Sequence, residues 1–353
     1  MAVDFPSSPT VGQRYTYLGV TYQFDGAKWV AGGAEAVDNL AFGIMPGGRL
    51  TCISGTPVDD GQSSTARTAI YYTPYIHDII PIWDGLRFQP RQFSEITLAL
   101  DSNTGHTYYH ATAGMYDLYV ADMSFMGGPS LVLCSTGIWS GNTRTIDPVR
   151  VDGVLVNEAN TGVRWSANVS DFTTLLAGYG TYVGTMWMSA NGQTKFYGGG
   201  VASGGAMAEL RLWNHYNRRA VSCAVVDNGA AFSYFGAARA YRASSTMRIN
   251  VVNGYAEDTY MVQTYARMDL TAGAFGTFYA SLDTTGSSNI FPNGELITTL
   301  NAQSYLTAQS YIAGGQVAFL GAHFISMNQA GNNANDIQWN GAGPAAMIAA
   351  IPM

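Results

Sequence analysis

Asp-Gly and Asn-Gly pairs are unusually frequent in this chain and restrict the folds open to it. Both central residues of a type I′ turn need a positive φ angle, which Gly adopts freely and which Asp and Asn tolerate better than most residues. Several pairs lie between runs of strand type and are therefore candidate β-hairpin turns. The pattern predicts an all-β protein. The nine pairs begin at Asp25, Asp60, Asp84, Asp152, Asn191, Asn228, Asn253, Asn293 and Asn340.

The segments between these pairs alternate apolar and polar residues with the period of two that half-buried strands need. Tyr15–Val30 predicts a three-stranded meander with an aromatic face, and Ile80–Phe88 predicts a hairpin. In Tyr116–Phe125 the residues at even positions fall on one face of a strand. Further strands are expected at Arg49–Ser54, Thr68–Tyr72, His106–Ala111, Ser130–Leu133, Gly153–Val156, Tyr182–Ser189, Gln193–Tyr197, Leu210–His215, Ala220–Val226, Phe232–Phe235, Met247–Val252, Tyr260–Met268 and Gly276–Leu282.

A few segments allow more than one interpretation. Phe93–Leu100 fits a strand or a helical turn capped by Ser94, and we favour the strand. The best helical candidates are Asp171–Leu176 and Thr298–Gln309. The apolar ending Ala345–Met353 predicts a last strand that packs inward or against a neighbouring subunit.

The chain is longer than one ordinary domain, so several modules are expected. Residues 1–45 predict a small β-meander module followed by an Ala- and Gly-rich linker. Residues 46–100 predict a hairpin-rich connector. Residues 101–353 predict a large antiparallel, jelly-roll-like β-sandwich region, as one large or two smaller sandwiches.

Charged residues make up only 12% of the chain, about half the usual share, while hydrophobic residues make up 47%. Few charges leave apolar surface exposed to aggregation, which indicates a surface that faces other subunits. The net charge of −7 argues against binding nucleic acid, which normally needs a basic face.

The three cysteines, Cys52, Cys134 and Cys223, are far apart and form no CxxC pair. Isolated thiols fit a protein made in a reducing cytosol, where Cys serves as a small hydrophobic residue. The N-terminus lacks the basic and apolar regions of a signal peptide, and no apolar run is long enough to span a membrane. We therefore expect neither a leader nor membrane insertion.

Phe5–Val30 carries the pattern Phe-Pro-x-x-Pro-x-x-Gly-x-x-Tyr followed by aromatic-Asp-Gly-x-x-Trp. It resembles a short module that recurs in virion proteins of tailed bacteriophages. Gly48–Leu100 is similar to a common phage segment in its stretches GRLTCISGTPV, IYYTPYIHDIIPIWDG and FSEITLAL. Asp152–Val154, Tyr182–Met186 and Arg211–Arg218 look like markers of the domain that often follows.

The resemblance implies a tail-fibre, spike or other appendage subunit, located in the virion after assembly in the host cytoplasm. Such proteins are typically homotrimers, with an N-terminal part for attachment to other virion proteins and a C-terminal β region for the host surface. They share no agreed catalytic motif, so the resemblance implies no catalytic, cofactor-binding or metal-binding residues. Two alternatives stay open: a capsid decoration or head-fibre protein without a receptor role, and a glycan-degrading tail spike.

Aromatic residues provide the candidate contact surface for host glycans or for docking. Trp and Tyr rings suit the half-wet sites in which sugars stack. A module of about 30 residues also needs most of its aromatic residues for its own core, and we favour core or particle docking over glycan contact. The candidates are Tyr17, Tyr22, Trp29, Tyr72 and Tyr75.

The remaining reactive groups do not single out an active site, and we predict that the protein is not an enzyme. His106 and His110 are four apart, a spacing that can serve a metal, but surface or interface histidines are the preferred interpretation. Glycan cleavage takes two carboxylates at a fixed separation. The acidic pairs Asp117/Asp122, Asp147/Asp152 and Glu257/Asp258 are of the number expected by chance. For Arg211, Arg218 and Arg219 we expect ion pairs with neighbouring acids.

Overall fold

The computed structural model describes residues 5–11, 13–17, 20–24, 26–31, 45–124, 127–257, 260–270, 275–285, 296–299, 304–312, 320–331, 337–339 and 344–353. Across these residues the named elements are strands, together with one short 3-10 turn, η3 (Tyr241–Ala243). The predicted all-β class is therefore confirmed.

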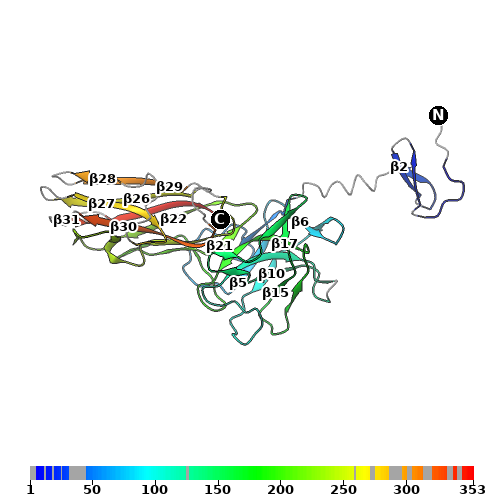
Figure 1. Ribbon diagram of the computed structural model, residues 1–353, viewed down its shortest axis with the longest axis horizontal. Helices are drawn as coiled ribbons and strands as arrows, with labels where there is room; N and C mark the ends of the chain where they lie inside the picture. The colour runs from blue at the N-terminus through cyan, green and yellow to red at the C-terminus, as the bar shows by residue number, and fades with distance from the viewer. Residues whose placement is uncertain are drawn as a thin grey trace.

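The N-terminal module is a three-stranded antiparallel meander, as the alternation of Tyr15–Val30 predicts (Figure 1). Its strands are β1 (Arg14–Tyr17), β2 (Val20–Phe24) and β3 (Trp29–Ala31). Tyr15 pairs with Tyr22 across β1 and β2, and Phe24 pairs with Trp29 across β2 and β3. This register gathers the aromatic residues into one cluster.

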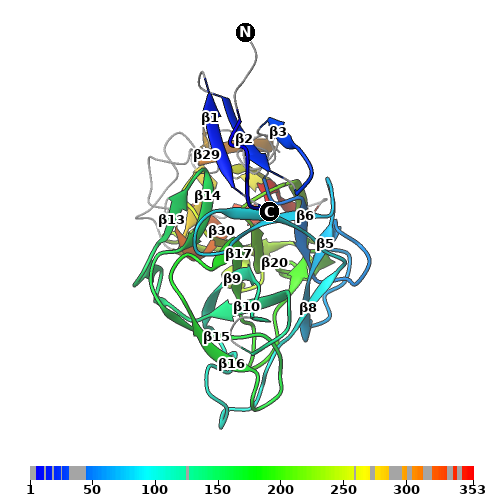
Figure 2. The same ribbon diagram turned by 90° about the vertical axis from the view of Figure 1, so that its right-hand side faces the viewer.

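An eight-stranded antiparallel sheet forms the centre of the next body, in the order β13-β14-β17-β9-β10-β15-β16 with β21 also paired to β17. Figure 2 shows β17, β9, β10, β15 and β16 following one another down the sheet. The strands are β9 (Met115–Ala121), β10 (Val132–Thr136), β13 (Pro148–Val151), β14 (Val154–Asn157), β15 (Thr161–Arg164), β16 (Phe172–Leu175), β17 (Gly180–Trp187) and β21 (Leu212–Asn214).

Residues of the predicted connector pack directly onto this sheet. They form the sheet β4 (Gly48–Thr51), β5 (Ala69–Pro74) and β8 (Ile96–Ala99), and the hairpin β6 (Ile79–Trp83) and β7 (Phe88–Gln92). The Leu50 backbone N–H donates to Asn214 Oδ1 at 2.6 Å, which ties β4 to β21. Segments 46–100 and 101–216 thus contribute to one hydrophobic core.

Two seven-stranded sheets form a sandwich at the C-terminal end (Figure 1, left). One sheet holds β18 (Phe196–Tyr197), β20 (Ala208–Leu210), β24 (Arg239–Ala240), β25 (Arg248–Asn253), β27 (Phe275–Leu282), β28 (Leu296–Thr299) and β30 (Gly321–Gly331). The other holds β19 (Val201–Ala202), β22 (Ala220–Asp227), β23 (Phe232–Ser233), β26 (Tyr260–Leu270), β29 (Ser304–Ile312), β31 (Ile337–Trp339) and β32 (Ala345–Pro352).

The predicted C-terminal strand is confirmed as β32, which lies inside its sheet between β22 and β26. Ala345, Met347, Ala349 and Ile351 are buried and the residues between them are more exposed. The strand therefore packs its odd positions into the sandwich, as the period of two requires.

The turns differ from the type I′ prediction. Among the described residues, only the pair Asp152-Gly153 has positive φ at both positions, 48° and 86°. At the confirmed β6–β7 hairpin, Gly85 alone has positive φ, and Asp84 Oδ1 accepts the backbone N–H of Leu86 and Arg87. This Asx interaction closes a four-residue loop without an αL conformation at Asp84. The pairs at Asp25, Asn293 and Asn340 include residues outside the described part of the chain.

Both helical predictions are wrong. Residues 172–175 form β16 because they pair with β15, in register Val163↔Thr173. Segment 298–309 includes parts of β28 and β29, and β29 pairs along nine residues of β26. Long-range strand pairing outweighs local helix propensity in both places. The strand predicted at 106–111 is also wrong: this segment is a turn held by hydrogen bonds described below.

Candidate functional site

The candidate aromatic residues of the N-terminal module pack on one another. The Trp29 ring stacks on Phe5 with centroids 5.2 Å apart, and Phe5 also contacts Tyr22 edge-on at 4.9 Å. Both Tyr22 and Trp29 are half-buried. The side chain of Tyr17 lies outside the described part of the structure. The described rings thus pack as the core of this small module.

The two tyrosines of β5 and its end have different environments. Tyr72 is 1% exposed, stacks on Phe93 at 5.0 Å and accepts a hydrogen bond from the Gly48 backbone N–H. Tyr72 as a surface contact residue is therefore wrong, because its side of β5 faces the core. Tyr75 is half-buried, and its hydroxyl accepts a hydrogen bond from Arg219 Nη1 at 2.9 Å.

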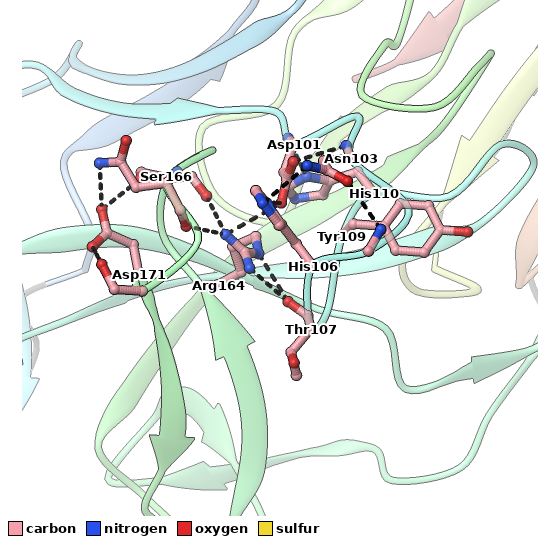
Figure 3. Close-up of polar contacts among 12 residues, drawn as sticks. Asp101, Asn103, His106, Thr107, Tyr109, His110, Arg164, Ser166 and Asp171 are labelled. Carbon is pink, nitrogen blue, oxygen red and sulfur yellow. Dashed lines mark hydrogen bonds and ion pairs between the residues drawn. The ribbon is translucent and has the colours of Figure 1, made fainter.

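A turn that connects β8 to β9 carries the two histidines four residues apart (Figure 3). His110 is fully buried, against the expectation of a surface histidine. Its Nδ1 accepts the Asp101 backbone N–H at 2.8 Å, which leaves Nε2–H to donate to Ser135 Oγ at 2.8 Å. Burial, with the nearby Arg164 charge, lowers the pKa of His110 to about 4, so the ring is neutral. His106 Nδ1 lies 2.8 Å from Asp101 Oδ2.

Arg164, at the end of β15, is the centre of this region (Figure 3). Its side chain is fully buried and pairs with Asp101 at 3.2 Å. Nε and Nη2 both donate to the Thr107 carbonyl, while Nη1 donates to the carbonyls of Ser166 and Asn168. One guanidinium thus fixes two loops, 101–110 and 165–171, relative to each other.

Loop 165–171 is also held together by hydrogen bonds to the Asp171 carboxylate. Asp171 Oδ2 accepts hydrogen bonds from Ser166 Oγ at 2.5 Å and from Asn168 Nδ2 at 2.9 Å. The hydrogen bond from Ser166 is the main cause that lowers the pKa of Asp171, so this carboxylate is ionised at neutral pH. The loop therefore holds an anionic group in one position beside Trp165.

A groove lies around Trp165, and we call it the Trp165 groove. It consists of two cavities of about 560 and 510 Å³ that share Trp165 and Pro129. The first is lined by Met123, Gly127, Gly128, Ser170, Asp171, Phe172 and Thr173, in addition to the shared pair. The second is lined by residues 92–97 and 130–132, in addition to the shared pair.

Glu95 is among the residues that line the second cavity, but its carboxylate is bound by residues that do not line that cavity. Ser54 Oγ donates to Oε1, and Thr73 Oγ1 and the Gly55 N–H donate to Oε2. Partial burial opposes ionisation of Glu95, but these hydrogen bonds outweigh it and lower the pKa. The ordered carboxylate of the groove is thus Asp171 in the first cavity, whereas the Glu95 carboxylate is held by Ser54, Gly55 and Thr73.

The acidic pairs noted in the sequence serve other contacts. Asp117 is buried and pairs with Arg144 at 2.7 Å, and Asp122 pairs with Arg91 at 2.6 Å. Arg144 also approaches Asp147 at 3.8 Å. Asp258 lies outside the described residues. Within the described part of the chain, no group of three His, Cys, Asp or Glu side chains could hold a metal ion.

Two of the three expected arginine ion pairs are present: Arg211 pairs with Glu209, and Arg218 pairs with Glu257 at 3.3 Å. Among the described residues Arg219 instead donates to the Tyr75 hydroxyl. The three cysteines are free and buried, and burial raises the pKa of the Cys223 thiol to about 12. In the described part of the chain, no helix is long and apolar enough to cross a membrane.

Trp165, Asp171 and Phe172 were not predicted as site residues. The sequence signal for them is a Trp followed by a Ser- and Asn-containing loop that ends in Asp-Phe. The helical interpretation of Asp171–Leu176 concealed it, because this segment is brought beside Trp165 by the pairing of β16 with β15. The groove also depends on residues 92–97 and 127–132, which are distant in sequence.

No protein-family model matches the sequence, and no curated protein matches it. Among solved structures, the chain is similar to one titled as infectious bursal disease virus, Gx strain, with 11% identity and a TM-score of 0.27. That match covers 82% of this chain and 65% of the other. The Cry4Aa mosquito-larvicidal toxin of Bacillus thuringiensis matches with 9% identity, a TM-score of 0.21 and coverage of 82% and 50%.

The chain thus spans between half and two thirds of the length of these two structures. TM-scores of this size carry no argument about function. The functional assignment therefore depends on the residues of the chain itself.

Proposed function

We propose that the chain is a structural subunit of a tailed-bacteriophage appendage, of the tail-fibre or spike type. It assembles with other virion proteins and attaches the particle to the host surface. The observation that carries this proposal is the N-terminal segment, in which the Phe-Pro motif packs through Phe5 on Trp29, the last residue of the Asp-Gly-x-x-Trp motif. Phe5 and Trp29, at the two ends of the motif, stack directly on each other.

We assign different roles to the N-terminal meander and to the larger β bodies because their structures differ. The meander is a compact aromatic unit suited to docking on the particle. The larger β bodies present loops at the ends of rigid strands, the usual location of binding residues. In this proposal the meander attaches the subunit and the Trp165 groove belongs to the outward, host-facing part.

A homotrimer is the proposed assembly, and one sheet face offers a contact surface between subunits. Where β26 pairs with β32, the outward residues are uncharged and include the exposed Met261 and Ile348, at 43% and 47%. The outward residues of β22 beside them are also uncharged. An exposed apolar patch with few charges is typical of a protein–protein contact.

The trimer is tested by light scattering on the full chain. We expect about three times the chain mass of 37.7 kDa. Ile348→Glu places a charge on the apolar face and should produce monomers, whereas Leu86→Glu, at an 88% exposed site in the β6–β7 hairpin, should not. A monomeric wild-type protein would contradict the trimer.

The location is tested by gold labelling of purified particles with an antibody raised against the full chain. We expect label at the tail end. Label on the head would favour the decoration or head-fibre alternative. Particles without label would contradict the assignment to the virion.

The non-enzymatic role is tested by incubation with host capsule and assay for new reducing ends. We expect none. Reducing ends that disappear in Asp171→Asn or Glu95→Gln would establish the glycan-degrading spike instead.

A further inference from the structure

We propose that the Trp165 groove binds an uncharged glycan, with one sugar on each side of Trp165. The inference rests on the proposed function for the source of that glycan, the host surface. The class of ligand is inferred from the geometry of the groove and the chemistry of its lining residues.

Trp165 provides the apolar contact. It is half-buried, packs against the core from one side and lines both cavities. An indole combines a broad apolar face with one polar N–H, which matches the alternating C–H and hydroxyl surfaces of a sugar. Among the described residues, the indole N–H of Trp165 has no acceptor, so it is available to a ligand oxygen.

The Asp171 carboxylate provides the polar contact. Asp171 lines the first cavity, and hydrogen bonds from Ser166 and Asn168 keep its carboxylate ionised and oriented. Hydrogen bonds to an ionised acceptor are stronger than neutral ones. Each carboxylate oxygen can accept more than one hydrogen bond, which leaves capacity for sugar hydroxyls.

The same carboxylate defines what the groove rejects. No described residue that lines either cavity is basic. A sialic acid, uronic acid or phosphorylated sugar would place its charge near Asp171 without a counter-ion among the lining residues, which costs binding energy. The groove therefore selects uncharged sugars over acidic ones.

The dimensions and rigidity fit a short stretch of glycan chain. Cavities of about 560 and 510 Å³ both lie in the range of small-molecule sites. Because they adjoin at Trp165, a ligand that continues across the tryptophan uses both. Arg164 holds the Ser166 and Asn168 carbonyls of the loop in place, which reduces the ordering cost on binding.

The test is binding of the full-length protein to an array of uncharged oligosaccharides built from glucose, galactose, mannose and N-acetylglucosamine. Sialylated and uronic acid oligosaccharides on the same array are the acidic probes. We expect binding to uncharged probes and at least tenfold weaker binding to acidic ones. Binding to acidic probes alone, or to no probe, overturns the proposal.

Three variants locate the site on the protein. Trp165→Ala should weaken binding roughly tenfold or more, as loss of a central aromatic anchor does. Ser130→Tyr, at an exposed residue of the second cavity, should block the groove while leaving the Trp165 loop unchanged, so it also covers the case in which Trp165→Ala misfolds. Trp29→Ala is the matched tryptophan control and should bind like the wild type. Unchanged binding by Ser130→Tyr, or loss confined to Trp29→Ala, refutes the site.

Particle labelling separates this inference from the proposed function. Labelled particles together with a protein that binds no glycan would remove only the groove assignment. Glycan binding at Trp165 by a protein that labels no particle would remove only the virion assignment.

Discussion

Arg144 and Arg164 are two buried arginines that each pair with a buried aspartate, yet they serve different purposes. Arg144 binds side chains: Nε and Nη2 contact both oxygens of Asp117, and Nη2 donates to the Tyr182 hydroxyl at 2.8 Å. Arg164 donates mainly to backbone carbonyls of surface loops and meets Asp101 at one longer contact of 3.2 Å.

The surroundings of the two arginines differ in the same way. Arg144 lies against the rings of Trp139 and Tyr255, 4.5 and 5.1 Å from their centroids, inside the core. Asp117 also accepts from the Trp139 indole N–H and Thr185 Oγ1, so the network satisfies itself. A buried pair of this kind holds strands together, whereas a buried arginine that binds loop carbonyls shapes a surface.

The largest expected effect is the loss of folding stability when the Arg144–Asp117 network in the core is broken. Arg144→Met leaves the Asp117 carboxylate buried without its cation, and removal of one partner of a buried pair costs about 3–5 kcal/mol. Urea denaturation followed by tryptophan fluorescence measures it. The double variant Arg144→Met/Asp117→Leu should regain most of the loss. A single variant within about 1 kcal/mol of the wild type, a fraction of the cost expected for such a pair, would show that the network is dispensable.

The second effect is a loss of stability in acid, which comes from a buried neutral histidine beside each arginine. Burial lowers the pKa of His110 to about 4 and that of His215 to about 3. Below about pH 6.5 the unfolded chain takes up protons at these residues and the folded chain does not. The free energy of unfolding therefore decreases as the pH is lowered. His110 alone contributes roughly 3 kcal/mol of loss by pH 4.

Chemical denaturation at several pH values between 7 and 4 checks this sign. His110→Gln keeps a donor and an acceptor but does not titrate in this range, so its stability should fall less steeply than that of the wild type. His106→Gln, at a half-buried position in the same turn, is the control. Identical slopes for the wild type and His110→Gln would contradict a neutral buried His110.

A third, smaller effect on stability should accompany a large effect on binding. Arg164→Met leaves Asp101 with His106 and the Asn103 N–H as partners and frees the carbonyls of exposed loops, so we expect a smaller loss than for Arg144→Met, about 1–3 kcal/mol. Glycan affinity should fall at least tenfold because loop 165–171 loses its anchor. Arg144→Met, measured at a temperature where it stays folded, should retain affinity. Equal affinity losses in both variants would remove the distinction between the two arginines.

The smallest effects come from paired tryptophan substitutions. Trp139→Phe removes the hydrogen bond to Asp117 and should cost about 1 kcal/mol of stability without changing glycan binding. Trp165→Phe should change stability less and weaken binding severalfold, since it keeps a ring but loses the indole N–H. Thermal denaturation of both proteins measures the stability loss, which should be larger for Trp139→Phe. Titration calorimetry measures the glycan affinity, which should be weakened only in Trp165→Phe.

The sequence predicted the parts of the fold that depend on local alternation. The meander at Tyr15–Val30, the hairpin at Ile80–Phe88 and the strand at Ala345–Pro352 all follow from a period of two. It did not predict the turn types, because Asp84 closes its loop through its side chain instead of adopting a positive φ angle.

The site was less predictable than the fold, for a physical reason. The Trp165 groove combines residues 92–97, 127–132 and 165–173, which meet only through strand packing around β8, β10 and β15. Burial of His110 depends likewise on Ser135, 25 residues away. Tyr72 shows the converse: an aromatic residue in an alternating strand gives no local sign of which face is covered.

The most direct test of the account is a crystal structure of the protein soaked with the uncharged oligosaccharide that binds it most tightly on the array. We expect a sugar ring packed on Trp165, with hydroxyls hydrogen-bonded to the Asp171 carboxylate and loop 165–171 held by Arg164. A sugar bound at Trp29, or elsewhere with an empty Trp165 groove, would contradict it.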